Sequence, residues 1–111
     1  MYVLLERAER TDGKCVSEIF PVHYRQGKVQ AAGNTVVVPL EDCNWRLTGL
    51  EWWQGRLFAL KTRFPGEEYE VVVVDLATGA PETVLDLTET LTAVTADGWH
   101  NNVEGLAFTP D

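Results

Sequence analysis

The sequence between residues 47 and 87 alternates short apolar segments with turn residues. Its centre, EYEVVVVDL at 68–76, holds four consecutive valines, and a β-branched run of this kind is typical of a strand covered on both faces. Three further strand-like segments occur at 47–55, 56–64 and 82–87. Gln54-Gly55, Pro65-Gly66 and the ATG sequence that begins at Ala77 supply the turns. We therefore predict a four-stranded antiparallel meander whose outermost strand is the most polar.

This pattern recurs along the chain at a spacing of about 55 residues. The C-terminal NNVEGLAFTPD aligns with RLTGLEWWQG, so that Gly105 falls on Gly49 and Phe108 on Trp52, 56 positions apart. The N-terminal MYVLLER aligns with RLFALKT at a spacing of 55, and CVSEIF falls near EVVVVD at the same spacing. The constant order and spacing indicate two copies of one unit.

The two copies are cut out of phase within a single domain, 1–111. Strands two to four of one unit fall at about 1–40, a complete unit at about 46–87, and the first strand of a next unit at about 102–111. A repeat of four antiparallel strands is typical of a β-propeller blade. We therefore predict an all-β fold of about two such blades in circularly permuted phase. The extra length after the outer strands predicts a short helix or loop at 88–100 and a short extra strand within NTVVVPLED.

At this point the sequence resembles known propellers. NVEGLAFTPD, taken with MYVLLER, resembles the EGLA…PDG opening of blades in the six-bladed phytase-like and esterase-like propellers of bacteria, and more distantly the gluconolactonase and senescence-marker group. VVVVDLATGAPETVLDL is similar to the third and fourth strands of many propellers, including quinoprotein types. In such families, a glutamate at the start of a first strand faces the central channel and binds a divalent cation, often calcium.

The resemblance implies this metal-binding role for Glu104. Asn101 and Asn102 would add oxygen ligands from the same junction, and calcium takes about six to eight oxygen ligands. The repeat counterpart of Glu104 is Thr48, so the blade itself does not require a carboxylate there. The alternative that stays open is an exposed acidic residue at the mouth of the channel.

The other residues whose side chains could take part in catalysis are isolated in the sequence. His100, in DGWHNN, is the candidate for acid–base catalysis, with a polar turn residue as the alternative. The sequence contains no nucleophile elbow, zinc-protease, phosphate-loop or dinucleotide motif. Four tryptophans could form a carbohydrate platform, but we favour packing between blades as their role: Trp45, Trp52, Trp53 and Trp99.

The composition limits the kinds of molecule that we expect the chain to bind. The net charge is −8, and residues 56–111 hold ten acidic and only three basic residues, which argues against nucleic acid because phosphate binding needs clustered Lys and Arg. No apolar run approaches the roughly 20 residues needed to span a bilayer. The N-terminal MYVLLERAER lacks the features of a signal peptide, and the localisation stays unassigned.

The two cysteines, Cys15 and Cys43, match no zinc or redox motif. A disulfide and two buried free thiols both remain open.

Two blades cannot close a ring, because stacked repeats generally need about three units to bury their faces. We therefore expect either a homo-oligomer, for example a trimer with six blades, or a piece of a longer propeller. The function predicted first is a scaffold or binding module that completes its ring with other copies. The alternative is part of a calcium-dependent phytase-like or esterase-like hydrolase, with calcium near Glu104.

Overall fold

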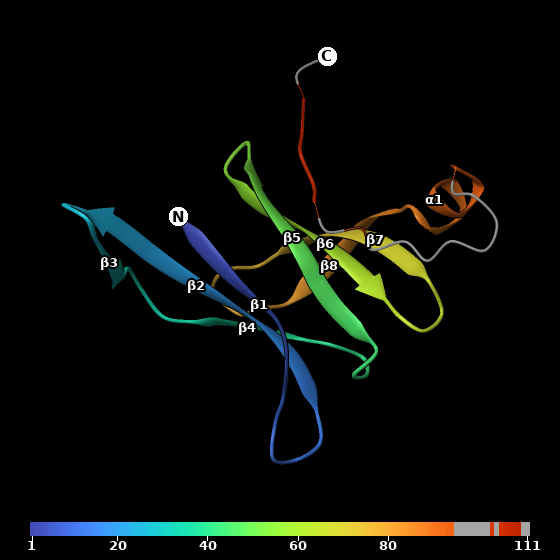
Figure 1. Cartoon of the computed structure of the whole chain (residues 1–111), viewed down its shortest axis with the longest axis horizontal. Coiled ribbons are helices and arrows are strands. Elements are labelled where there is room, and N and C mark those ends of the chain that lie inside the picture. The colour runs from blue at the N-terminus through green and yellow to red at the C-terminus, as the bar shows by residue number, and fades with distance from the viewer. Residues whose placement is uncertain (95–102, 104, 110–111) are drawn as a thin grey trace.

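The computed structural model describes residues 1–94, 103 and 105–109, and within them the fold is all-β apart from one short helix (Figure 1). These residues form two four-stranded antiparallel sheets. The first sheet contains β1 (Tyr2–Glu9), β2 (Cys15–Arg25), β3 (Lys28–Ala31) and β4 (Val36–Pro39). The second contains β5 (Trp45–Trp53), β6 (Arg56–Arg63), β7 (Glu68–Val74) and β8 (Pro81–Asp86), and α1 (Thr88–Val94) follows.

The second sheet is the predicted meander. Its strands pair in the order β5-β6-β7-β8, which confirms the sequence pattern between 47 and 87. Gln54 and Gly55 join β5 to β6 with φ values of 50° and 76°. Positive φ at both central residues is characteristic of a type I′ turn, whose twist matches that of the flanking strands. A second Gln-Gly pair, Gln26 and Gly27, joins β2 to β3 in the same way.

The outer position of the first sheet is shared by two short strands. On one side β2 pairs with β1. On its other side, the first half of β2 pairs with β4 and the second half pairs with β3. The short strand predicted within NTVVVPLED is therefore present as β4. In the described part of the chain β1 pairs with β2 alone, so its second edge forms no strand pairing, although β5 packs close to β1.

The main core lies between the two sheets. It combines Ile19 and Val38 of the first sheet with Leu47 and Val72 of the second, all fully buried. Ser17 is buried between the sheets as well, and its hydroxyl donates to the carbonyl of Glu6 and accepts a 3.1 Å hydrogen bond from the backbone N–H of Leu47. A buried N–H of β5 thus finds its partner in the first sheet.

The opposite face of the second sheet is covered by the C-terminal segment. Phe58, Val71 and Val73 form a second buried cluster, and Leu106 and Phe108 pack against it. Adjacent strand residues point to opposite faces, so this cluster and the main core lie on the two sides of one sheet. The described residues at 103 and 105–109 form no strand in the single chain.

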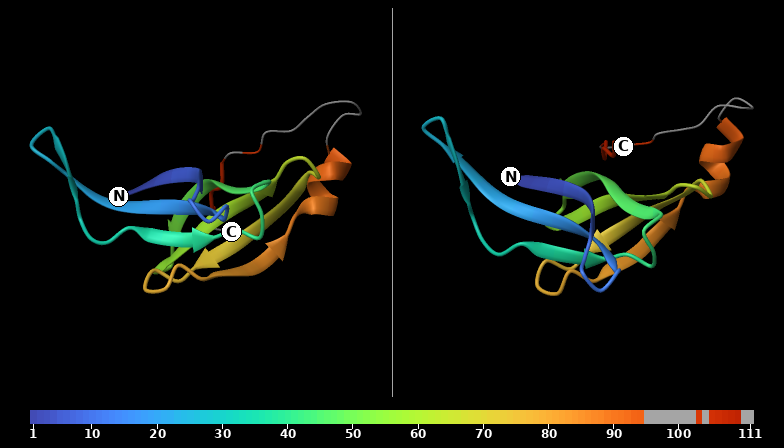
Figure 2. Two further views of the ribbon diagram at one scale, coloured as in Figure 1. Left: turned by 90° about the horizontal axis from the view of Figure 1, so that it is seen from below. Right: turned by 60° about the horizontal axis from the view of Figure 1, so that its bottom comes forward.

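Figure 2 shows the β2–β3 hairpin and α1 at opposite ends of the molecule, with the second sheet beside the first. The helix α1 occupies the start of the segment for which a helix or loop is predicted, 88–100. Within the residues that the structure describes, no helix has the length and apolar character needed to cross a membrane.

Candidate functional site

The predicted metal and catalytic residues lie outside the described part of the chain: His100, Asn101, Asn102 and Glu104. The residue between two of them, Val103, is described. Its carbonyl accepts a 2.9 Å hydrogen bond from the Thr48 hydroxyl in β5. This bond holds the C-terminal segment beside β5 at Thr48. Thr48 is also the residue that the sequence repeat aligns with Glu104.

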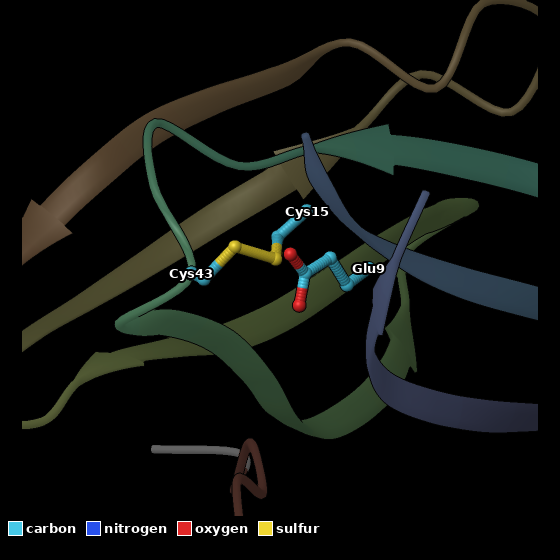
Figure 3. Close-up of side chains that lie close together, drawn as sticks. All are labelled: Glu9, Cys15 and Cys43. Carbon is cyan, nitrogen blue, oxygen red and sulfur yellow. A yellow bond between two sulfur atoms is a disulfide. The ribbon is translucent and has the colours of Figure 1, made fainter. Parts of the chain in front are cut away.

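Cys15 and Cys43 form a disulfide that joins the start of β2 to the loop before β5, with a Cα–Cα distance of 5.1 Å. The carboxylate of Glu9 lies beside it (Figure 3), and one ligand atom from each of the three residues falls within 4.8 Å of the others. Metals bind the thiolate form of cysteine, which a disulfide lacks. This group is therefore a covalent link between the sheets, without the ligands of a metal site.

A buried lysine, Lys61, also contacts the loop before β5. The Lys61 ammonium on β6 forms ion pairs with Glu41 and, at 3.7 Å, with Glu70. It also lies 4.6 Å from the centre of the Trp45 ring, while its side chain is only 4% exposed. Two carboxylates and an aromatic face compensate the charge for its loss of water. Glu41 precedes β5, so the cluster anchors that loop to the second sheet.

The three described tryptophans all contact other side chains, although Trp52 and Trp53 are 49% and 37% exposed. Trp45 is buried beneath Lys61. Trp52 stacks on Tyr2 of the first sheet, and Trp53 stacks on Phe108. The neighbours Trp52 and Trp53 therefore face opposite sides of β5, as alternation predicts. Trp99 lies outside the described residues.

Two aromatic contacts repeat at a constant spacing. Tyr2 stacks on Trp52 with ring centres 6.1 Å apart, and Phe58 packs on Phe108 with ring centres 4.6 Å apart. Phe58 follows Tyr2 by 56 positions, and Phe108 follows Trp52 by the same 56. The segment 103–109 thus lies on the second sheet as β5 lies on the first.

The alternation of faces along β1 agrees with this spacing, whereas the pairing partner on β2 is matched at a spacing of 52. Leu4 pairs with Ile19 in the first sheet. The residues 56 and 52 positions later, Leu60 and Val71, pair in the second. The spacing of 55 predicted for this strand would match Leu4 with a residue on the opposite face of β6, because a one-residue slip exchanges the faces of a strand. A spacing of 56 therefore matches the packing.

No protein-family model, curated protein or solved structure matches the chain.

The spacing of 56 also identifies a surface that is left uncovered. Val3 and Leu5, on the outer face of β1, are 47% and 42% exposed. Their counterparts 56 positions later are Ala59 and Lys61, which are 0% and 3% exposed because the first sheet and the loop before β5 cover them. The first sheet thus exposes Val3 and Leu5 to solvent on a face whose repeat equivalent in the second sheet is buried. The sequence predicted β1 as a strand, but its exposure follows only from the packing of the two sheets.

Proposed function

We propose that this chain is a β-propeller-type scaffold or binding module and that several copies assemble to complete a ring of blades. In this proposal β1 and β2 are strands two and three of one blade, and β3 and β4 together occupy the position of its fourth strand. The strands β5 to β8 form a complete blade. Residues 103–109 supply the first strand of the next. Three copies would then give six blades.

The repeated contact carries the proposal: Trp52 on Tyr2 is followed, 56 positions later, by Phe108 on Phe58. A face-to-face sandwich would bring equivalent faces of its two sheets together. In this chain, one face of the first sheet contacts the second sheet. Its repeat equivalent is the outer face of the second sheet, on which Leu106 and Phe108 pack. This correspondence supports head-to-tail stacking, in which each unit would cover the previous one as blades do around a propeller.

The uncovered face of the first sheet supports assembly. Val3 and Leu5 are exposed, whereas their repeat counterparts are buried. An apolar strand face with a free edge is a site of association unless it is covered. The alternative of a calcium-dependent hydrolase has the family resemblance at Glu104 as its support.

Sedimentation equilibrium tests the assembly. We expect a native mass that is a multiple of the 12.4 kDa chain, with three chains for a six-bladed ring. A protein that stays monomeric at all concentrations up to the millimolar range would contradict the proposal. Calorimetric titration with calcium, on the natural chain and on Glu104→Ala, tests the alternative, which requires binding that the substitution abolishes.

A further inference from the structure

The free edge of β1 has a paired equivalent within the same chain. The repeat counterpart of β1 is β6, which pairs with β5 on one side and with β7 on the other. In the first sheet, β2 takes the place of β7, and the described residues contain no strand in the place of β5. The segment that corresponds to β5 by the spacing of 56 is 103–109.

We propose that residues 103–109 of one copy pair antiparallel with the free edge of β1 in a second copy. This inference rests on the proposed assembly and adds its contact surface, its partner and its register. The binding mode is strand addition to a sheet edge, in which main-chain hydrogen bonds supply affinity and alternate side chains supply specificity.

The pairs between β5 and β6 give the register. Leu50 pairs with Ala59 in the second sheet. Adding 56 to Leu50 gives Leu106, and subtracting 56 from Ala59 gives Val3. Leu106 of one copy therefore lies opposite Val3 of the next. The neighbouring pair, Gly49 with Leu60, places Gly105 opposite Leu4 in the same way.

The side chains agree with this register. Leu106 packs against the outer cluster of its own second sheet. Val3 lies on the exposed face of β1, which in this arrangement turns toward the same cluster. The two residues therefore meet on one side of the new strand pair, and Val3 and Leu5 become covered. The described residues of the donor segment, 103 and 105–109, carry no charge, so the side chains that carry this register are uncharged.

The partner is a second copy because one chain carries both the donor segment and the acceptor edge. The two surfaces differ, so the contact is head-to-tail and generates a ring where the rotation closes. It also continues an existing interface, since the donor already lies on its own second sheet through Phe108 and Phe58. The second copy adds its first sheet to that surface.

Cysteine cross-linking between different chains tests the register. Because Cys15 and Cys43 are joined, Val3→Cys and Leu106→Cys each carry one free thiol. Directly opposite residues have Cα atoms about 4.5–5.5 Å apart, within the range of a disulfide. After mixing the two variants with oxidised glutathione, we expect a covalent heterodimer on a non-reducing gel.

The matched control is Val84→Cys on the outer strand β8, because Val84 is 46% exposed and Val3 is 47% exposed. Paired strands hold two thiols at an effective concentration far above that in bulk, so we expect cross-linking of Val3→Cys with Leu106→Cys to be about tenfold faster than that of Val84→Cys with Leu106→Cys. Equal rates for the two mixtures would overturn the proposed pairing.

Hydrogen exchange on the unmodified chain gives a second test that does not depend on the folding of any variant. We expect the amides of β1 to become protected as the concentration rises through the assembly range found by sedimentation. An oligomer whose β1 amides stay unprotected would overturn the pairing but leave the scaffold proposal standing. A protein that is monomeric throughout would overturn both.

Discussion

Gly79, in the turn between β7 and β8, lies directly against the backbone carbonyl of Val37 in β4. A Cβ atom built on Gly79 would lie 1.8 Å from that oxygen. The φ angle of Gly79 is +79°, a conformation that residues with a side chain rarely adopt. The turn therefore fits against the first sheet only because residue 79 has no side chain.

We predict that Gly79→Ala destabilises the protein because the two sheets must separate at this point. Overpacking of this kind costs about 1–3 kcal/mol, in addition to about 1 kcal/mol for the positive φ. Gly55→Ala is the matched control, since its φ is +76° and a Cβ there would have no atom within 4 Å. Urea unfolding should show a clearly larger loss for Gly79→Ala. Equal losses would mean that the contact with Val37 adds nothing.

The disulfide between Cys15 and Cys43 gives the second prediction. It closes a loop of 28 residues between the first sheet and the strand that begins the second. Chain-entropy arguments assign a loop of this length about 3.5 kcal/mol. We expect the double variant Cys15→Ala, Cys43→Ala to lose unfolding free energy of this order in urea, and reduction of the natural chain should have a similar effect. A midpoint that does not respond to reductant would show that the bond contributes no stability.

The sequence predicts the second sheet well because its signals are local. The valines at 71–74 favour a strand, and Gln54-Gly55 favours a two-residue turn, whatever the rest of the chain does. The disulfide was not predictable, because the pairing of two cysteines depends on the distance that the whole fold sets between them. The burial of Lys61 was not predictable for the same reason, since its partner Glu41 comes from a distant loop.

The repeat shows the limit of sequence comparison most clearly. The match of Gly105 with Gly49 gave a spacing of 56, but the N-terminal strand gave 55, because MYVLLER and RLFALKT are apolar at most positions in either register. A slip of one residue costs little in residue similarity and exchanges every side chain between the two faces. The face that Tyr2 turns toward Trp52 decides between the two spacings.

Lys61 gives a prediction in which two substitutions differ. Lys61→Ala removes both the charge and the stem that packs on Trp45, and large-to-small changes at buried positions cost about 2–5 kcal/mol. Lys61→Met keeps most of the volume, and replacing a buried ion by an apolar side chain of similar size is often close to neutral. We therefore expect thermal or urea unfolding to show the larger loss for Lys61→Ala. The reverse order, with Lys61→Met the more damaging, would mean that the ion pairs with Glu41 and Glu70 dominate.

Asp86 gives a prediction for acid pH. Its carboxylate accepts a 2.9 Å hydrogen bond from the backbone N–H of Thr88 at the start of α1. This bond, helped by the Thr88 hydroxyl, lowers the pKa of Asp86 below its ordinary value of 3.8. A lowered pKa in the folded state stabilises the protein above pH 3.8, and the contribution is lost as the pH falls through the folded value.

An NMR titration of the Asp86 side-chain carboxyl should therefore give a midpoint below 3.8, and the midpoint should return to the ordinary value in denaturing urea. In Asp86→Asn, the corresponding part of the acid dependence of unfolding should be absent. An unchanged acid dependence in that variant would show that the Thr88 bond does not couple the titration to folding.

The contact of Phe108 with Phe58 gives the last prediction. Phe108 also stacks on Trp53 at 4.9 Å, so Phe108→Ala should release the C-terminal segment from the second sheet and expose more of Trp53, which is already 37% exposed. Aromatic truncation in a full core costs about 3–5 kcal/mol, and we expect less here because Phe108 is only partly buried. Tryptophan emission should shift to longer wavelength, and an assembled protein should dissociate because the donor segment is no longer held. Thr109→Ala, at an exposed neighbour, serves as the control and should change neither property. If Phe108→Ala keeps both the natural emission and the natural mass, the segment does not hold the next unit in place.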